Sequence, residues 1–151
     1  MCGANAATLA IHDMGYRIPV LQTEGGSYYR LKDETGSVLR VAIRLNGTLT
    51  GARQGNFSVN TNVDMTVFTP SRHRRPELFN PTPQDPQSLV VNEDVGYEAI
   101  LDEPNVYVVD NALISTRPAI EQIKRTSLYT SNGEPLYLVN AMPLFKVLKT
   151  P

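Results

Sequence analysis

The chain is poor in the residues that build disulfide or metal scaffolds. It has 151 residues, of which one is cysteine and two are histidine. A single cysteine excludes a disulfide framework within the chain. Cys2, His12 and His73 do not form a usual zinc ligand set, so we expect no metal and no cofactor. A chain of this length can bury a core large enough to fold without either.

Long apolar runs and an excess of one charge are also missing. Hydrophobic residues make up 41% and charged residues 19% of the sequence, and the formal net charge is −1. No run approaches the roughly 18 apolar residues of a transmembrane helix, so we expect no membrane role. The segment from Met1 to Tyr16 lacks the basic start and apolar stretch of a secretory signal, so we expect synthesis in the cytoplasm. With so small a net charge, nucleic-acid binding depends on where individual basic side chains lie.

The sequence contains no complete catalytic motif, and Cys2 is its one candidate for a nucleophile. Removal of Met1 would expose Cys2 as an N-terminal nucleophile whose own amine acts as the base. The further glycine, arginine and aspartate motifs of enzymes that use this arrangement are missing. No G-x-S-x-G elbow and no glycine-rich phosphate loop is present. We expect a protein without enzymatic activity and keep a Cys2 enzyme as a third hypothesis.

Alternating apolar and polar residues, the pattern of half-buried strands, extend through Leu113. The pattern predicts strands at Tyr16–Gln22, Ser27–Leu31, Ser37–Asn46, Phe57–Phe68 and Val106–Leu113. The first is expected at a sheet edge, because Pro19 cannot donate a ladder hydrogen bond. In the third, the apolar residues face a core, while Arg40 and Arg44 project from the other side.

A proline-rich segment separates the last two of these strands. The stretch from Pro70 to Pro104 holds six of the eleven prolines, and we expect residues 69–105 to form a projecting loop within a single domain, 1–151. Ser88–Val91 and Tyr97–Leu101 are a possible hairpin inside it. The loop's candidate contact residues, for a second subunit, an acidic partner or nucleic acid, are Arg72, Arg74, Arg75, Pro81 and Pro83. A solvated loop is the alternative.

Two helical patterns close the chain. The first is expected from about Arg117 to Ser131, and the second opens at Pro135 and ends before Pro143. Their apolar residues are Ile120, Ile123, Leu128, Leu136, Val139 and Met142. The expected fold class is α+β, an antiparallel β-sheet with two C-terminal helices. Such helices cover either their own sheet or that of a second subunit.

The polar face of the best strand is a candidate RNA-binding surface. Arg40 and Arg44 would project from it about 13 Å apart, which allows contacts with two phosphates. Asn60 and Asn62 extend this face on the next strand, with Tyr107 as a stacking side chain from the last one. An ordinary solvent-exposed sheet face is the alternative, since Asp64 weakens the positive field.

Four segments resemble a known family in their order along the chain. They are Tyr28–Arg30, Leu39–Arg44, Asn62–Phe68 and Pro135–Met142. This order is similar to that of the coat proteins of single-stranded RNA bacteriophages. The resemblance implies an N-terminal hairpin before a sheet, an intertwined homodimer whose helices lie over the partner's sheet, and an icosahedral shell that holds RNA on its inner sheet face. It also implies that the loop 69–105 joins dimers, although this loop is longer than the family's usual one.

The hypothesis from sequence is therefore a virion coat subunit, made in the host cytoplasm, whose partners are itself and RNA. The alternative is a decoration or cement protein of a double-stranded DNA phage capsid. Such a protein would use a β-rich body and a loop without an RNA face.

Overall fold

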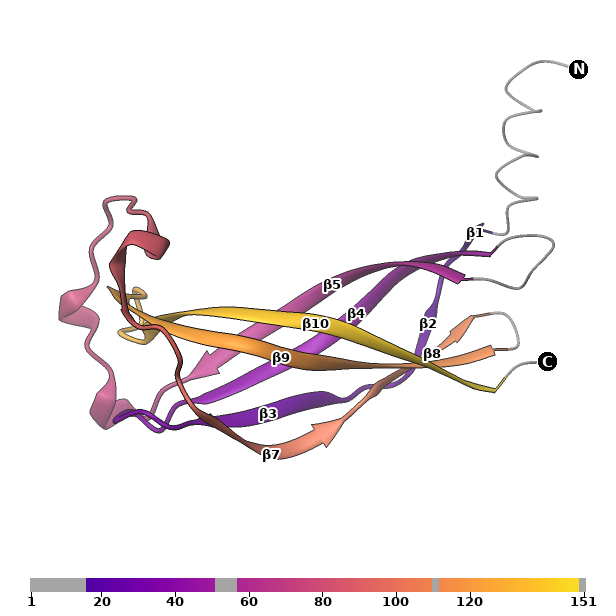
Figure 1. Cartoon of the computed structure of the whole chain (residues 1–151), viewed down its shortest axis with the longest axis horizontal. Coiled ribbons are helices and arrows are strands. Elements are labelled where there is room, and N and C mark those ends of the chain that lie inside the picture. The colour runs from indigo at the N-terminus through magenta and orange to yellow at the C-terminus, as the bar shows by residue number, and fades with distance from the viewer. Residues whose placement is uncertain (1–15, 51–56, 110–111, 150–151) are drawn as a thin grey trace, which may run out of the picture.

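The computed structural model describes residues 16–50, 57–109 and 112–149, and these form two antiparallel β-sheets (Figure 1). Sheet A contains β1 (Tyr16–Arg17), β3 (Gly26–Leu31), β4 (Val38–Thr50), β5 (Phe57–Phe68) and β7 (Tyr97–Glu103). Sheet B contains β2 (Val20–Thr23), β6 (Val90–Asn92), β8 (Asn105–Val109), β9 (Ala112–Tyr129) and β10 (Pro135–Lys149).

Each sheet is built along one long central strand. In sheet A, β5 pairs with one edge of β4, β3 and β1 pair with the other, and β7 lies beyond β3. In sheet B, β10 pairs with one edge of β9, β8 and β6 pair with the other, and β2 lies beyond β8. The longest edge strands are therefore β5 and β7 in sheet A and β10 and β2 in sheet B, and the short strands β1 and β6 also have a partner on one side only.

The predicted α+β fold with two C-terminal helices is wrong, because β9 and β10 form a long antiparallel hairpin. All six residues assigned to the helices lie in these strands: Ile120, Ile123, Leu128, Leu136, Val139 and Met142. The expectation of an intertwined dimer held by C-terminal helices is therefore wrong as well. No helix among the described residues is long and apolar enough to cross a membrane.

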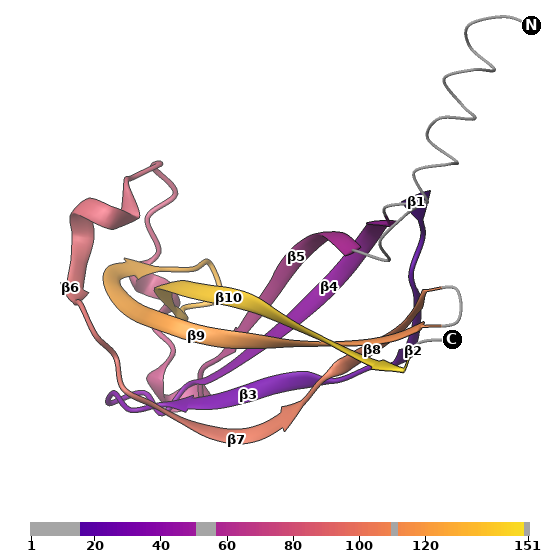
Figure 2. The ribbon, with the colours of Figure 1, turned by 45° about the vertical axis from the view of Figure 1, so that its right-hand side comes forward.

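A β-bulge explains why β9 has helical spacing. Asn140 pairs with Gln122 and Ala141 pairs with Ile120, so Glu121 is an extra residue in the strand. A bulge shifts the alternation of the strand by one position. Ile120 and Ile123, three residues apart, therefore both pack into the core. Figure 2 shows the strong curvature of β9, which is expected of a bulged strand.

The predicted strands in the first half of the chain are largely confirmed. β3, β4 and β5 cover the expected segments, and β4 extends further, to Thr50. The segment Tyr16–Gln22 instead divides near Pro19 into β1, which pairs with β4, and β2, which pairs with β8. The prediction of an N-terminal hairpin is therefore wrong. The last predicted strand also divides, since Leu113 belongs to β9.

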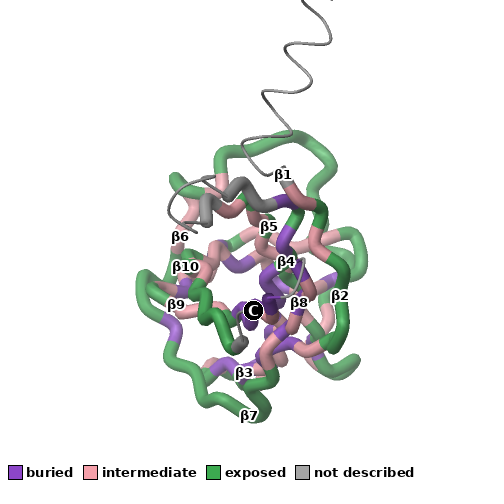
Figure 3. The backbone as a smooth tube through the Cα atoms, turned by 90° about the vertical axis from the view of Figure 1, so that its right-hand side faces the viewer, coloured by how far each residue is buried: buried purple, intermediate pink, exposed green. Residues whose placement is uncertain are grey.

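The core lies between the inner faces of the two sheets, where Figure 3 shows the buried backbone. One apolar cluster holds Tyr29, Leu31, Leu39, Val41, Val95, Ile123 and Tyr137, and a smaller one holds Leu45, Tyr107, Val109 and Ile114. A buried polar link joins the sheets next to the smaller cluster. The amide of Asn105 and the hydroxyl of Thr116 donate to the carbonyl oxygen of Ile43, at 2.9 and 3.0 Å.

The proline-rich segment projects beyond the sheets at the end opposite β1 (Figures 1 and 2). It contains three 3-10 helices, η1 (Ser71–His73), η2 (Pro76–Leu78) and η3 (Pro86–Leu89). It is shorter than the predicted loop 69–105, because β7 and the start of β8 occupy its last part. The suggested hairpin is wrong, since β6 pairs with β9 and β7 pairs with β3.

A glycine closes the β9–β10 hairpin where the sequence suggested the end of a helix. Gly133 has φ +83°, and an added Cβ would lie 2.4 Å from the backbone nitrogen of Pro76. We expect Gly133→Ala to lower the free energy of unfolding by about 2 kcal/mol, through backbone strain and this clash. Gly36→Ala is the control, because Gly36 has φ +59° with open space around it. It should cost about 1 kcal/mol in urea denaturation. Equal losses in the two variants would show that the contact with Pro76 is absent.

Candidate functional site

The predicted RNA-binding residues of β4 and β5 lie together on one surface. Arg40 and Arg44 of β4 and Asn60 and Asn62 of β5 are on the solvent side of sheet A, which we call the outer face of sheet A. The residues of β4 that alternate with the two arginines are buried against sheet B. Arg44 lies directly opposite Asn62 in the strand register.

Arg40 is held by contacts within its own chain. Its Nε donates to the hydroxyl of Tyr28 at 3.1 Å, and its Nη2 donates to the carbonyl oxygen of Gly25 at 3.0 Å. The guanidinium also lies 5.8 Å from the centre of the Tyr28 ring, within the range of a cation–π contact. Only 27% of the side chain is exposed, and Glu24 lies 4.0 Å away. Arg40 therefore holds the turn before β3 more than it offers a free charge.

Arg44 is more accessible. Its Nη2 lies 2.9 Å from a carboxylate oxygen of Asp64, with 60% of the arginine side chain exposed. An exposed ion pair of this kind contributes about 0–1 kcal/mol, so it holds the Arg44 side chain only weakly. The carboxylate also reduces the positive potential, as the sequence predicted.

Tyr107 does not belong to this surface, which corrects its prediction as a stacking side chain. It lies on β8 of sheet B, is 5% exposed and packs in the smaller core cluster with Leu45, Val109 and Ile114. Because its ring is enclosed by the core, no base can stack on it. Alternation alone does not tell which face of a late strand is the inner one.

The basic run of the projecting segment bonds largely to its own backbone. Arg74 donates to the carbonyl oxygen of Thr69 at 2.9 Å, and the side chain of Arg75 donates to the carbonyl oxygens of Arg72 and Arg74. The backbone N–H of Arg75 donates to Gly133, which joins the segment to the β9–β10 turn. The side chains of Arg72, Pro81 and Pro83 are exposed.

A buried polar network that sequence reasoning missed joins the turn after β3 to the β9–β10 hairpin. One carboxylate oxygen of Asp33 accepts from the N–H and hydroxyl of Thr35. The other accepts from the hydroxyl of Tyr137 at 2.5 Å and from Arg125 at 3.3 Å. Arg125 also pairs with Glu34. The side chains of Asp33 and Arg125 are only 4% and 13% exposed.

The network shifts the titration of its members. Burial alone would raise the pKa of Asp33, but hydrogen bonds from Thr35 and Tyr137 and the charge of Arg125 outweigh it and lower the pKa. Burial raises the pKa of Tyr137 to about 12, and the hydrogen bond to Asp33 adds to the rise. The Asp-x-Thr spacing is a visible turn signal, whereas its partners lie some 90 to 105 residues away.

The network links two distant parts of the chain through Asp33. Each oxygen of Asp33 accepts two hydrogen bonds, one oxygen from Thr35 and the other from Tyr137 and Arg125. The described residues also contain no group of three or more histidine, cysteine, aspartate or glutamate side chains placed to hold a metal. Cys2 lies outside the described residues.

The open sheet edges form an unusually apolar surface in the part of the chain that the structure describes. All four residues of β2 and all seven of β7 are exposed, on both faces of each strand. Large apolar side chains are exposed along β10, namely Met142, Leu144, Phe145, Val147 and Leu148. Ile18, Val20 and Leu21 at β2, and Tyr97, Ile100 and Leu101 on β7, are exposed as well.

Comparisons with protein-family models, with curated proteins and with solved structures found no match to this chain. Its function is therefore inferred from its own surfaces.

Proposed function

We propose that this protein is a structural subunit that assembles with copies of itself into a shell, as the coat subunit of a virion. The observation that supports the proposal is the set of open sheet edges that carry large apolar side chains. Such edges present unpaired backbone N–H and C=O groups, which readily pair with another chain. Contiguous exposed apolar surface is likewise typical of protein–protein interfaces.

The arrangement of the edges favours an extended assembly over a simple pair. β5 and β7 are opposite edges of sheet A, and β10 and β2 are opposite edges of sheet B, so one subunit can contact more than one neighbour. Interfaces between different surfaces of identical subunits generate rings or open arrays, while a two-fold interface closes on itself. A shell needs both kinds of contact.

The proposal extends to RNA through the outer face of sheet A. Arg44 is exposed and forms a weak surface ion pair with Asp64, and Asn62 lies opposite it in the register. Neutral amides, and an arginine that can exchange its ion-pair partner, suit contacts to the sugar–phosphate backbone. Such contacts position nucleic acid without reading its sequence. Arg40 supports this face by fixing the turn before β3.

A decoration protein that binds a preformed shell is the second candidate. The projecting segment favours it, because Leu78 and Phe79 are 53% and 42% exposed there. A decoration protein would form discrete small oligomers without nucleic acid, whereas a coat subunit would form large particles.

The edge of β10 gives a direct test of assembly. Phe145→Glu places a charge on an exposed apolar strand, so we expect at least about a tenfold loss of association with an unchanged circular dichroism spectrum. Ser127→Glu is the matched control, because Ser127 is an exposed residue of β9 near the other end of the hairpin. Mass photometry of both variants would check this. Equal association of the wild type and Phe145→Glu would remove β10 from the assembly surface.

A further inference from the structure

The four longest edge strands differ in whether they can pair with themselves. Within the described chain, β5, β7, β10 and β2 each have a strand partner on one side only. In a two-fold contact between identical edge strands, each residue meets a symmetry-related residue of the other copy. Directly opposed like charges and internal prolines therefore occur twice in such a contact, and each occurrence destabilises it.

Three of the edges oppose self-pairing. On β10, Pro143 removes a donor from the strand, and the run that follows it has only six residues, of which Lys146 and Lys149 are charged. On β7, pairing about the strand's midpoint places Glu98 opposite Asp102. β2 has only four residues and follows Pro19 directly. These edges suit contacts with a different surface of a neighbour.

β5 has none of these features. It is 12 residues long and contains no proline. Antiparallel pairing about Asn62 places Asn60 of each copy opposite Asp64 of the other, where the amide can donate to the carboxylate. The same register places Thr61 opposite Val63 and Val59 opposite Met65. Polar residues then meet polar residues on the outer face of sheet A, and no like charges are opposed.

We propose that β5 pairs with β5 of a second copy, antiparallel about a two-fold axis at Asn62, so that sheet A continues across the dimer. The inference rests on the self-assembly proposed above and names one of its contacts. It differs from the helix-mediated dimer that the sequence suggested, because the contact is a strand edge.

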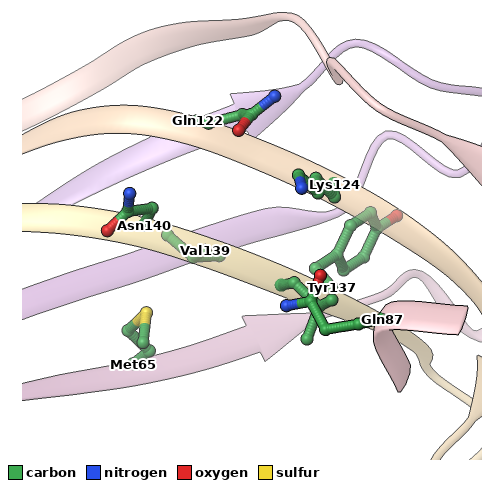
Figure 4. A pocket seen from close by; sticks show the side chains of 8 residues that line it. Met65, Gln87, Gln122, Lys124, Tyr137, Val139 and Asn140 are labelled. Carbon is green, nitrogen blue, oxygen red and sulfur yellow. The ribbon is translucent and has the colours of Figure 1, made fainter. Parts of the chain in front are cut away.

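An open groove along the same edge supports this pairing. It has a volume of about 440 Å³ and lies between β5 and the hairpin of β9 and β10, with Met65 facing Val139 and Asn140 across it (Figure 4). A second groove continues along the edge past Val67 and Leu136. Met65 is 46% exposed in the single chain. The inner-face side chains of the second copy's β5 would extend the apolar layer beside it.

Opposite charge changes at Asn60 test the register. Asn60→Asp places a carboxylate opposite Asp64 twice per dimer, so we expect the dimer dissociation constant to rise about tenfold or more. Asn60→Lys places an ammonium opposite the same carboxylate and should leave dimerisation equal to or tighter than wild type. Ser127→Asp adds the same charge to β9, which is not an edge strand, and should leave the dimer unchanged. Sedimentation velocity of nuclease-treated protein measures all four chains, with circular dichroism to verify folding.

Two results would overturn the pairing. Equal dissociation constants for the wild type and both Asn60 variants, in a chain that still assembles, would remove β5 from the contact and leave the proposed function standing. A wild-type chain that stays monomeric up to about 100 µM, where a micromolar interface is populated, would remove both proposals.

Discussion

Replacing Asp33 with alanine should lower the free energy of unfolding by about 3 kcal/mol, because it leaves Tyr137 and Arg125 buried without their shared acceptor. In a chain of this size that loss corresponds to a fall in Tm of about 6–12 °C. Differential scanning calorimetry would measure it. Asp94→Ala, at an exposed position, is the control and should change the free energy by less than about 0.5 kcal/mol.

The same network gives the stability a pH dependence of known sign. The pKa of Asp33 is lower in the folded chain than in the unfolded chain, so its contribution is present above the unfolded value of about 3.9. It is lost as the pH falls through the folded pKa. The difference in Tm between wild type and Asp33→Ala should therefore shrink below about pH 4. A difference that is constant from pH 7 to pH 3 would show that Asp33 is not paired as described.

Ile123→Ala should also cost about 3 kcal/mol, since Ile123 is fully buried in the larger core cluster. Met142→Ala should cost less than about 1 kcal/mol, because 48% of Met142 is exposed. The pair separates the two architectures. On the predicted helices both residues lie on the apolar face, so both substitutions would strongly lower the free energy of unfolding. Urea denaturation of the two variants would decide, and equal large losses would support the helices.

The sequence predicted strands well where apolar residues recur at every second position over most of the strand. β4 has Leu39, Val41, Ile43 and Leu45 at this spacing, β5 has Val63, Met65 and Val67, and both strands were found. The C-terminal hairpin was missed because bulges interrupt its alternation. The extra residue near Glu121 brings Ile120 and Ile123 to one face, and a further irregularity lies between Pro135 and Tyr137. When the alternation shifts by one position within a strand, apolar residues of one face lie three residues apart. From the sequence alone, that spacing is typical of a helix.

The candidate surfaces show the same limit of local patterns. The shared face of Arg40, Arg44, Asn60 and Asn62 follows from alternation and was predicted. The contacts of Arg40 with Gly25 and Tyr28, and the burial of Tyr107, depend on how distant strands pack. The partners of Asp33 depend on the same packing, with Arg125 and Tyr137 far along the chain. Periodicity within one segment carries no signal for such pairings.

The loss of the two helices also changes which part of the coat hypothesis is supported. In the resembling family the helices make the dimer, whereas here the segment Pro135–Met142 lies in an edge strand. The proposed assembly therefore depends on strand edges and their apolar side chains. This is a physical reason to expect association that does not use the family resemblance.

The most direct test is the molar mass of the purified full chain in solution. Size-exclusion chromatography with multi-angle light scattering, absorbance at 260 and 280 nm and negative-stain microscopy would be applied before and after nuclease treatment. We expect closed particles of megadalton mass that retain nuclease-protected RNA, against the 16.7 kDa of one chain. A monomer without nucleic acid at every concentration would contradict the proposed shell subunit.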